Sequence, residues 1–191
     1  MDKITKIITS LDDNINYAIE YAFQEQIDTI LIFTKDGEAA IKLRSKIIER
    51  NLGIQVIAVS FPANEPIFSY NDEENKVEEY IPETSNKAIR EKLKEQDIPL
   101  VLASMPFEDI VIPGSKFYTY NVIKEALSLV FPELHLAIQS VIMATDTGHL
   151  EPADRVLSLT KLSCVDIISS NERLLFHPEK GLKVQHVVCR P

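Results

Sequence analysis

Apolar residues follow two alternating patterns along the first two thirds of the chain, and each pattern predicts a different element. Apolar positions recur every three to four residues over 15–23 and again over 40–48, the spacing of an amphipathic helix. The short apolar runs 29–35 and 54–60 are continuous, which is typical of strands buried on both faces of a parallel sheet. This order predicts a βαβ unit with a right-handed crossover.

Local signals predict where these helices begin and end. Asp12 or Asp13 is expected to cap the first helix, because a side-chain oxygen can accept hydrogen bonds from the first free amides. Gly37 opens the second helix, and Asn51 with Gly53 supplies its stop signal.

The alternation continues after a break. Residues 61–83 form a break that contains prolines, and we expect its acidic run at 71–83 to be a solvated loop. The remaining expected elements are a helix from Thr84 or Ser85 to Lys94, a strand at 99–104, a loop to Ser115, helices at about 119–130 and 133–147, and strands at 155–160, 165–170 and 182–189. The helix at 133–147 is apolar on nearly every side and ends at Gly148, so we expect it to be buried.

These elements predict one α/β domain over residues 1–191. We expect a three-layer, doubly wound, mostly parallel sheet whose strand-rich C-terminal end leaves room for an antiparallel edge.

Composition and charge exclude several classes of protein. The chain is 45% hydrophobic and 26% charged, so it can bury a core, and no apolar run approaches the length of a membrane span. Its formal net charge of −9 argues against nucleic acid as a partner. We find no export signal and expect a cytoplasmic protein. Cys164 and Cys189 have no metal-ligand spacing with the four histidines, so no metal or cofactor is expected and both thiols are predicted to be reduced and buried.

Hydroxyl and ammonium groups gather where the predicted strands end. In open α/β sheets, ligands bind beyond the carboxyl ends of the strands. Thr34 with Lys35, and Thr160 with Lys161, stand at two such ends, and Gly37 allows close approach of the backbone to a small anion. Ser60, Ser104 and Ser169 with Ser170 follow other predicted strands. The alternative is that these hydroxyls only cap or orient the helices that follow.

Three stretches resemble one known family in their order along the chain. TILIFTKDGEAAIKLRSKIIERNLGIQVIAVS at 29–60 resembles the strand, turn, helix and strand of the C-terminal domain of pyruvate kinase. IQSVIMATDTGHLEPADRVLSLT at 138–160 and GLKVQHVVCRP at 181–191 are similar to later parts of stand-alone proteins that resemble this domain. The resemblance implies the same fold in nearly the whole chain.

The resemblance also implies a function, with departures that weaken it. In pyruvate kinase this domain resembles a regulatory module that binds a sugar bisphosphate through a Thr/Ser-rich turn. Only Thr34, Lys35 and Gly37 match that turn, because Asp36 replaces a Ser or Thr. The resemblance therefore implies a binding or regulatory module for a small phosphorylated or otherwise anionic metabolite.

Pyruvate kinase activity is not expected, since 191 residues leave no room for a catalytic barrel beside this domain. Two other interpretations stay open. One is a small enzyme of unknown reaction that uses the same strand-end cleft, with Asp36 or Asp146 as acid or base. The other is a homo-oligomeric structural protein without a ligand.

Overall fold

The sheet that organises the molecule is seen in a computed structural model, which describes residues 4–71, 76–108 and 119–191. Within these residues, seven strands form one sheet in the order β1-β9-β8-β7-β2-β3-β6, and β4 and β5 form a separate pair. The strands are β1 (Lys6–Ile7), β2 (Thr29–Phe33), β3 (Gln55–Ser60), β4 (Ile67–Asn71), β5 (Lys76–Tyr80), β6 (Leu100–Leu102), β7 (Arg155–Leu159), β8 (Cys164–Ile168) and β9 (Lys183–Arg190).

Strand directions confirm the predicted mostly parallel sheet. Every neighbouring pair in the large sheet is parallel except the two pairs that include β8, which runs antiparallel to β7 and to β9. The antiparallel strand therefore lies inside the sheet and not at its edge. A tight turn joins β7 directly to β8, where the Thr160 N–H donates to the carbonyl oxygen of Ser163, and so short a connection forces the chain to reverse.

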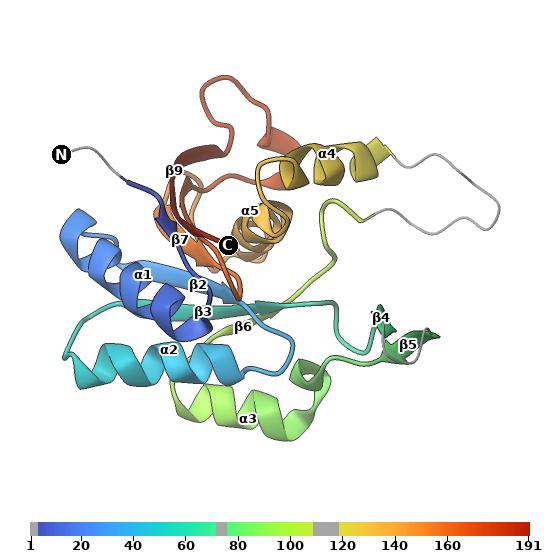
Figure 1. The fold of residues 1–191 in the computed structure, drawn as a ribbon, viewed down its shortest axis with the longest axis horizontal. Helices are drawn as coiled ribbons and strands as arrows, with labels where there is room; N and C mark the ends of the chain where they lie inside the picture. The colour runs from blue at the N-terminus through green and yellow to red at the C-terminus, as the bar shows by residue number, and fades with distance from the viewer. Residues whose placement is uncertain (1–3, 72–75, 109–118) are drawn as a thin grey trace.

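Helices cover both faces of the sheet and make the three predicted layers (Figure 1). One apolar core joins the sheet to α1, α2 and α3, and a second joins its other face to α4 and α5. The helices are α1 (Leu11–Glu25), α2 (Glu38–Glu49), α3 (Lys87–Glu95), α4 (Thr119–Ser128) and α5 (Leu134–Asp146). The burial predicted for the helix before Gly148 is confirmed, since ten residues of α5 are buried. None of the helices described is long and apolar enough to cross a membrane.

Helix ends follow the sequence signals in part. Gly37 is the N-cap of α2, and Asn51 and Gly148 adopt positive φ just beyond the ends of α2 and α5. The predicted cap of α1 is wrong: the Ser10 hydroxyl, not a side chain of Asp12 or Asp13, accepts the hydrogen bond from the Asp13 N–H at 3.1 Å.

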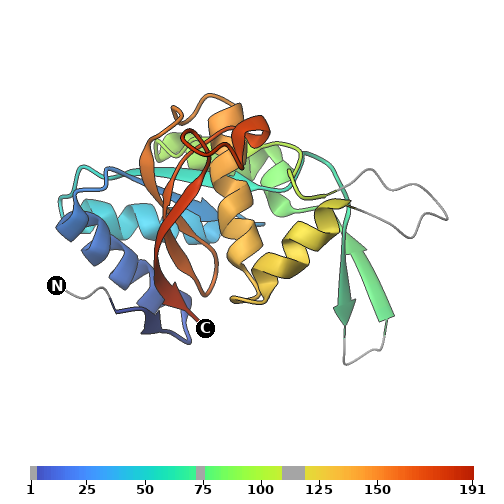
Figure 2. The same cartoon turned by 90° about the horizontal axis from the view of Figure 1, so that it is seen from above.

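Two further expectations, for the acidic loop and for the start of α3, differ from the structure. The expected solvated loop at 71–83 includes β5, which pairs antiparallel with β4, and the two strands project away from the large sheet (Figure 2). Asn86, rather than Thr84 or Ser85, caps the following helix through the N–H of Ala88. Residues 72–75 of the acidic stretch and 109–118 of the expected loop before α4 lie outside the described residues.

The winding of the chain reverses between β2 and β7. From β2 the chain passes through α2 to β3 and then through α3 to β6, with both helices on one face of the sheet. It returns through α5 on the other face to β7. Strand β7 then pairs with β2 on the side opposite β3, with Ile32 facing Leu159. The carboxyl ends of β2 and β7 therefore meet at a topological switch point, the place where open α/β sheets bind ligands.

Candidate functional site

A pocket of about 400 Å³ lies beyond the carboxyl ends of β2 and β7. Four of the five residues predicted to bind a ligand line it, namely Thr34, Lys35, Thr160 and Lys161. They meet because the two strands are parallel neighbours, so residues that leave them leave at the same edge. The fifth, Gly37, is buried at the start of α2 beside the lining residues Asp36 and Glu38.

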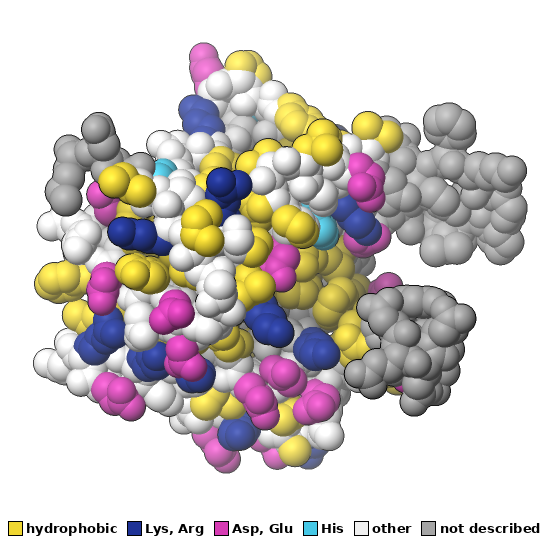
Figure 3. Space-filling model, viewed as in Figure 1, with side chains coloured by type: hydrophobic (Ala, Val, Ile, Leu, Met, Phe, Trp, Pro, Cys, Tyr) yellow, Lys and Arg dark blue, Asp and Glu magenta, His cyan; other side chains and the backbone are white. Residues whose placement is uncertain are grey.

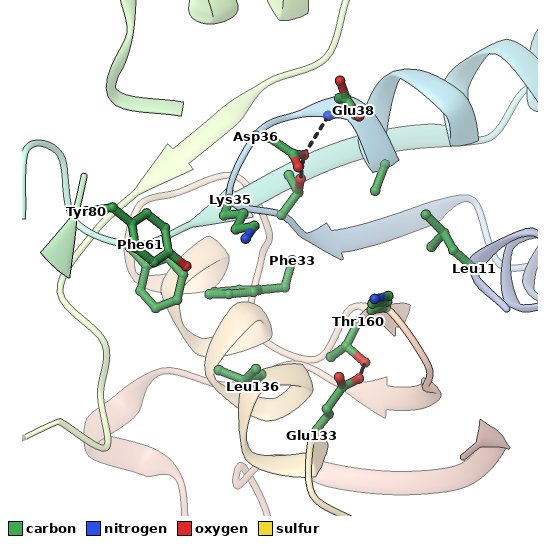
Figure 4. Close-up of a pocket in the computed structure, with 13 residues that line it drawn as sticks. Leu11, Phe33, Lys35, Asp36, Glu38, Phe61, Tyr80, Glu133, Leu136 and Thr160 are labelled. Carbon is green, nitrogen blue, oxygen red and sulfur yellow. Dashed lines mark hydrogen bonds between the residues drawn. The ribbon is translucent and has the colours of Figure 1, made fainter. Parts of the chain in front are cut away.

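The floor of the pocket is apolar and partly aromatic. Phe33 packs edge to face against Phe61, with ring centroids 5.0 Å apart. Leu136 of α5 and Tyr80 at the end of β5 also line the pocket, and Figure 4 shows them around Phe33 and Phe61. The space-filling view shows hydrophobic side chains exposed in a hollow bordered by charged ones (Figure 3). This surface can hold the apolar part of a small molecule.

Two ammonium groups border this floor. Lys35 Nζ lies 5.2 Å from the centroid of the Tyr80 ring, within the range of a cation–π contact. Lys35 and Lys161 are both exposed. The ion pairs in the described part of the chain involve other cations: Lys42, Arg44, Lys46, Lys87, Lys124 and Arg155. Neither pocket lysine is therefore neutralised by a protein carboxylate among those residues.

The turn at the start of α2 satisfies its own amides. The Thr34 hydroxyl accepts the Gly37 N–H at 3.0 Å and donates to Asp36 Oδ1 at 3.0 Å. The same carboxylate oxygen accepts the Glu38 N–H at 3.0 Å. The open backbone cradle expected at Gly37 is therefore filled by Thr34 and Asp36, so an anion in this pocket would meet lysine side chains rather than these two amides.

The structure explains why a glycine stands at position 37. Its φ of +80° is one that residues with side chains rarely adopt, and an added Cβ would stand 3.1 Å from Ile89 Cγ2. The glycine allows α2 to begin directly after the turn and to pack against α3.

Glu133 is a pocket residue that the sequence did not indicate. It stands at the N-cap position of α5 and is half-buried. Its Oε2 accepts hydrogen bonds from the Thr160 hydroxyl and, at 3.2 Å, from the Leu162 N–H. Ser163 Oγ lies 2.6 Å from Thr160 Oγ1 and donates to it, since the Thr160 proton is directed to the carboxylate. The sequence held one signal for this residue: Glu133 is acidic and stands at the start of the helix that leads back to the switch point.

Other residues singled out in the sequence lie away from the pocket lining. Asp146 ends α5 on the side of the sheet opposite the pocket, beyond the amino ends of β2 and β7. There it accepts a hydrogen bond from Asn171 Nδ2 at 2.7 Å. Ser169 and Ser170 are also on that side, because β8 is antiparallel, and their hydroxyls donate to backbone carbonyls. The hydroxyl groups of Ser60 and Thr84 form a hydrogen bond of 2.7 Å.

The remaining candidates add no chemistry to the pocket. Ser104 is exposed just beyond β6. Cys164 and Cys189 are buried free thiols. Among the described residues, no group of three or more His, Cys, Asp or Glu side chains is placed to hold a metal ion.

Comparisons with known proteins give only distant structural similarities. No protein-family model and no curated protein matches the chain. A crystal structure of Cryptosporidium parvum pyruvate kinase matches with 15% identity and a TM-score of 0.39, covering 85% of this chain and 23% of that one. The same organism's pyruvate kinase in complex with ADP matches with 14% identity and a TM-score of 0.38, covering 98% and 25%.

This chain therefore spans about a quarter of the length of these pyruvate kinases. TM-scores below 0.5 are too low to establish a shared fold or function. The α/β fold class accordingly rests on the sheet order, strand directions and layers described above.

Proposed function

We propose that this chain is a binding module for a small organic anion with an apolar body, and that the ligand occupies the pocket between β2 and β7. Lys35 and Lys161 would hold the anionic group, a carboxylate or a phosphate ester, and Phe33 with Leu136 would support the apolar part. The convergence of the two unneutralised lysines on an aromatic floor carries this proposal. It includes no catalytic step and no pyruvate kinase activity.

Three features of the pocket support reversible binding. A lysine that a protein carboxylate does not neutralise can form charge-assisted hydrogen bonds with a ligand. The contact between Lys35 and the Tyr80 ring keeps the ammonium group near the pocket without removing its charge. A concave, mostly apolar surface with a few convergent polar groups is the usual form of a small-molecule site.

Calorimetric titration with aromatic anions tests the proposal. We expect 3-phenylpropionate or phenyl phosphate to bind, and the uncharged 3-phenylpropan-1-ol to bind at least tenfold more weakly, because it cannot pair with an ammonium group. Comparing the two anions distinguishes a carboxylate site from a phosphate site. No binding of either anion would overturn the proposal.

Lysine variants place the binding in the pocket. Lys35→Ala and Lys161→Ala should each weaken anion binding about threefold to fivefold, the range of an exposed ion pair. Lys183→Ala is the matched control, because Lys183 is an exposed lysine at the start of β9 that does not line the pocket. Equal affinity in all three variants would exclude this site.

A further inference from the structure

The pocket contains an anionic group as well as the two lysines. Two lysines and three carboxylates line it, so the formal charge of its lining is −1. A ligand that carried only negative charge would add to this excess. A ligand with one positive and one negative group would leave the net charge of the site unchanged while pairing with both kinds of side chain.

The three carboxylates differ in their freedom to bind a ligand. Asp36 is held in the turn before α2 by the hydrogen bonds described above, and in Figure 4 Lys35 lies between Asp36 and the Phe33 ring. Glu38 is exposed, and Figure 4 shows it at the outer side of the turn, far from Phe33 and Leu136. Neither is well placed to receive a group whose apolar neighbour rests on the pocket floor.

Glu133 is better placed. It is half-buried at the start of α5, one turn before Leu136, and its Oε2 is fixed by Thr160 and by the Leu162 N–H. Two hydrogen bonds to one oxygen hold the carboxylate in a single orientation. Among the described residues, no hydrogen bond to Glu133 Oε1 is found, which leaves this oxygen as an acceptor at the wall of the pocket.

We infer that the ligand is an amphipathic amino carboxylate, such as an amino acid with a large apolar side chain. Its ammonium group binds Glu133 Oε1, its carboxylate binds Lys35 or Lys161, and its side chain lies against Phe33 and Leu136. This assignment rests on the proposed function, because it uses the same lysines for the anionic group. It adds the second charged group and so restricts the class of ligand.

Three probes that share a phenylethyl group test the assignment by calorimetry. L-Phenylalanine carries both charged groups, 3-phenylpropionate lacks the amine and 2-phenylethylamine lacks the carboxylate. We expect the intact protein to bind L-phenylalanine about tenfold more tightly than 3-phenylpropionate, as for loss of one charge-assisted hydrogen bond. 2-Phenylethylamine should also bind more weakly than L-phenylalanine.

Matched carboxylate variants separate the role of Glu133 from a general charge effect. Glu133→Gln keeps an oxygen that can accept from Thr160 and Leu162, and it should lower the affinity for L-phenylalanine about tenfold. The affinity for 3-phenylpropionate should not fall, and it should rise if anything, because the variant removes one negative charge from the lining. Glu38→Gln removes the same charge from the rim and should change neither affinity by more than about twofold.

Amide chemical shifts of the unmodified protein provide a readout that needs no variant. L-Phenylalanine should shift the Leu162 amide resonance, because that N–H is bonded to the carboxylate that takes the ammonium group. 3-Phenylpropionate, whose only contact near this amide is with the neighbouring Lys161, should shift this resonance less at equal saturation, and equal shifts would count against the contact with Glu133.

The outcomes distinguish the two proposals. If 3-phenylpropionate binds and L-phenylalanine binds no more tightly, or if Glu133→Gln does not weaken L-phenylalanine, the amino-carboxylate assignment fails and the anion-binding proposal stands. If only 2-phenylethylamine binds, or none of the three probes binds, the amino-carboxylate assignment fails, and the anion-binding proposal fails as well if phenyl phosphate also does not bind.

Discussion

Asn14 donates one side-chain N–H to the carbonyl oxygen of Thr160 at 3.0 Å. Its second N–H binds the carbonyl oxygen of Ser163 at 2.9 Å, and the side chain is fully buried. One residue of α1 therefore fixes both ends of the turn that carries Thr160 and Lys161 into the pocket. The Ser163 carbonyl also accepts the Thr160 N–H, so the loss of Asn14 would leave the Thr160 carbonyl without its buried donor.

We predict that Asn14→Leu lowers the free energy of unfolding by about 2 kcal/mol, since a leucine of similar size removes both hydrogen bonds and leaves the Thr160 carbonyl without its donor. Urea denaturation measures the loss. Asn16→Ala is the control in the same helix: Asn16 accepts hydrogen bonds from Lys46 and Arg50 at the surface and should cost less than about 1 kcal/mol. Equal losses in the two variants would contradict the role of Asn14.

A buried carboxylate in the middle of β8 depends on one arginine. Asp166 is fully buried in β8 and accepts from Arg155 Nε at 3.0 Å and Nη2 at 2.6 Å. Tyr21 also donates to it at 2.9 Å, and Glu25 binds the same guanidinium. Hydrogen bonds from Arg155 to Asp166 and Glu25 hold the pKa of the guanidinium above its ordinary value, so the arginine stays charged.

We predict that Arg155→Met lowers the free energy of unfolding by about 2–3 kcal/mol, because it leaves Asp166 buried without its countercharge. The side chain of Arg155 is 35% exposed, so solvent reduces the loss below that of a fully buried pair. The double variant Arg155→Met, Asp166→Leu should be more stable than the single one, because no buried charge is left unpaired. Additive losses by denaturation would refute this coupling.

The sequence predicted the layers and the place of the pocket because both depend on simple periodicities. Apolar runs and amphipathic stripes gave the strands and helices of the first two thirds of the chain. Parallel strands bring their carboxyl ends to one edge, so Thr34 and Lys35 could be expected near Thr160 and Lys161 once β2 and β7 were neighbours.

Other parts of the site depend on the tertiary structure and could not be predicted in this way. The capture of the Gly37 and Glu38 amides by Thr34 and Asp36 depends on side-chain torsions that periodicity does not report. Glu133 reaches Thr160 only because α5 crosses back over the sheet. The direction of β8 could not be predicted either, because an apolar run shows the same pattern in a parallel and in an antiparallel strand. Because β8 is antiparallel, Ser169 lies on the side of the sheet opposite the pocket.

Gly37 and Gly53 flank α2 and offer a matched pair of substitutions. Gly37→Ala should lower the free energy of unfolding by about 1–2 kcal/mol, because an alanine strains the positive φ and crowds Ile89. Gly53→Ala should be neutral or stabilising by up to about 1 kcal/mol, since its Cβ would meet open space at an ordinary φ. Thermal denaturation of both variants measures the difference, and equal effects would show that α2 can begin without a glycine.

The two buried thiols predict how stability changes at high pH. Cys164 and Cys189 face each other across β8 and β9. Desolvation, followed by the charges of Cys189 and Asp166, raises the pKa of Cys164 well above its ordinary value of 9.0. Desolvation also raises the pKa of Cys189 to about 12, although Lys6 opposes the shift. The folded state therefore favours protonated thiols.

Because the folded pKa values are raised, this stabilisation is fully present below pH 9 and is lost as the pH rises toward 12. Within that window each thiol should contribute a fall of up to about 1.4 kcal/mol per pH unit in the free energy of unfolding. Urea denaturation between pH 8 and pH 10.5 under reducing conditions measures the slope. Cys164→Ala and Cys189→Ala lower stability at every pH by creating a cavity, but each should make the alkaline slope shallower by the contribution of one thiol. The comparison of each variant with the unsubstituted protein isolates the contribution of one thiol, so an unchanged slope would mean that the thiols do not ionise on unfolding in this range.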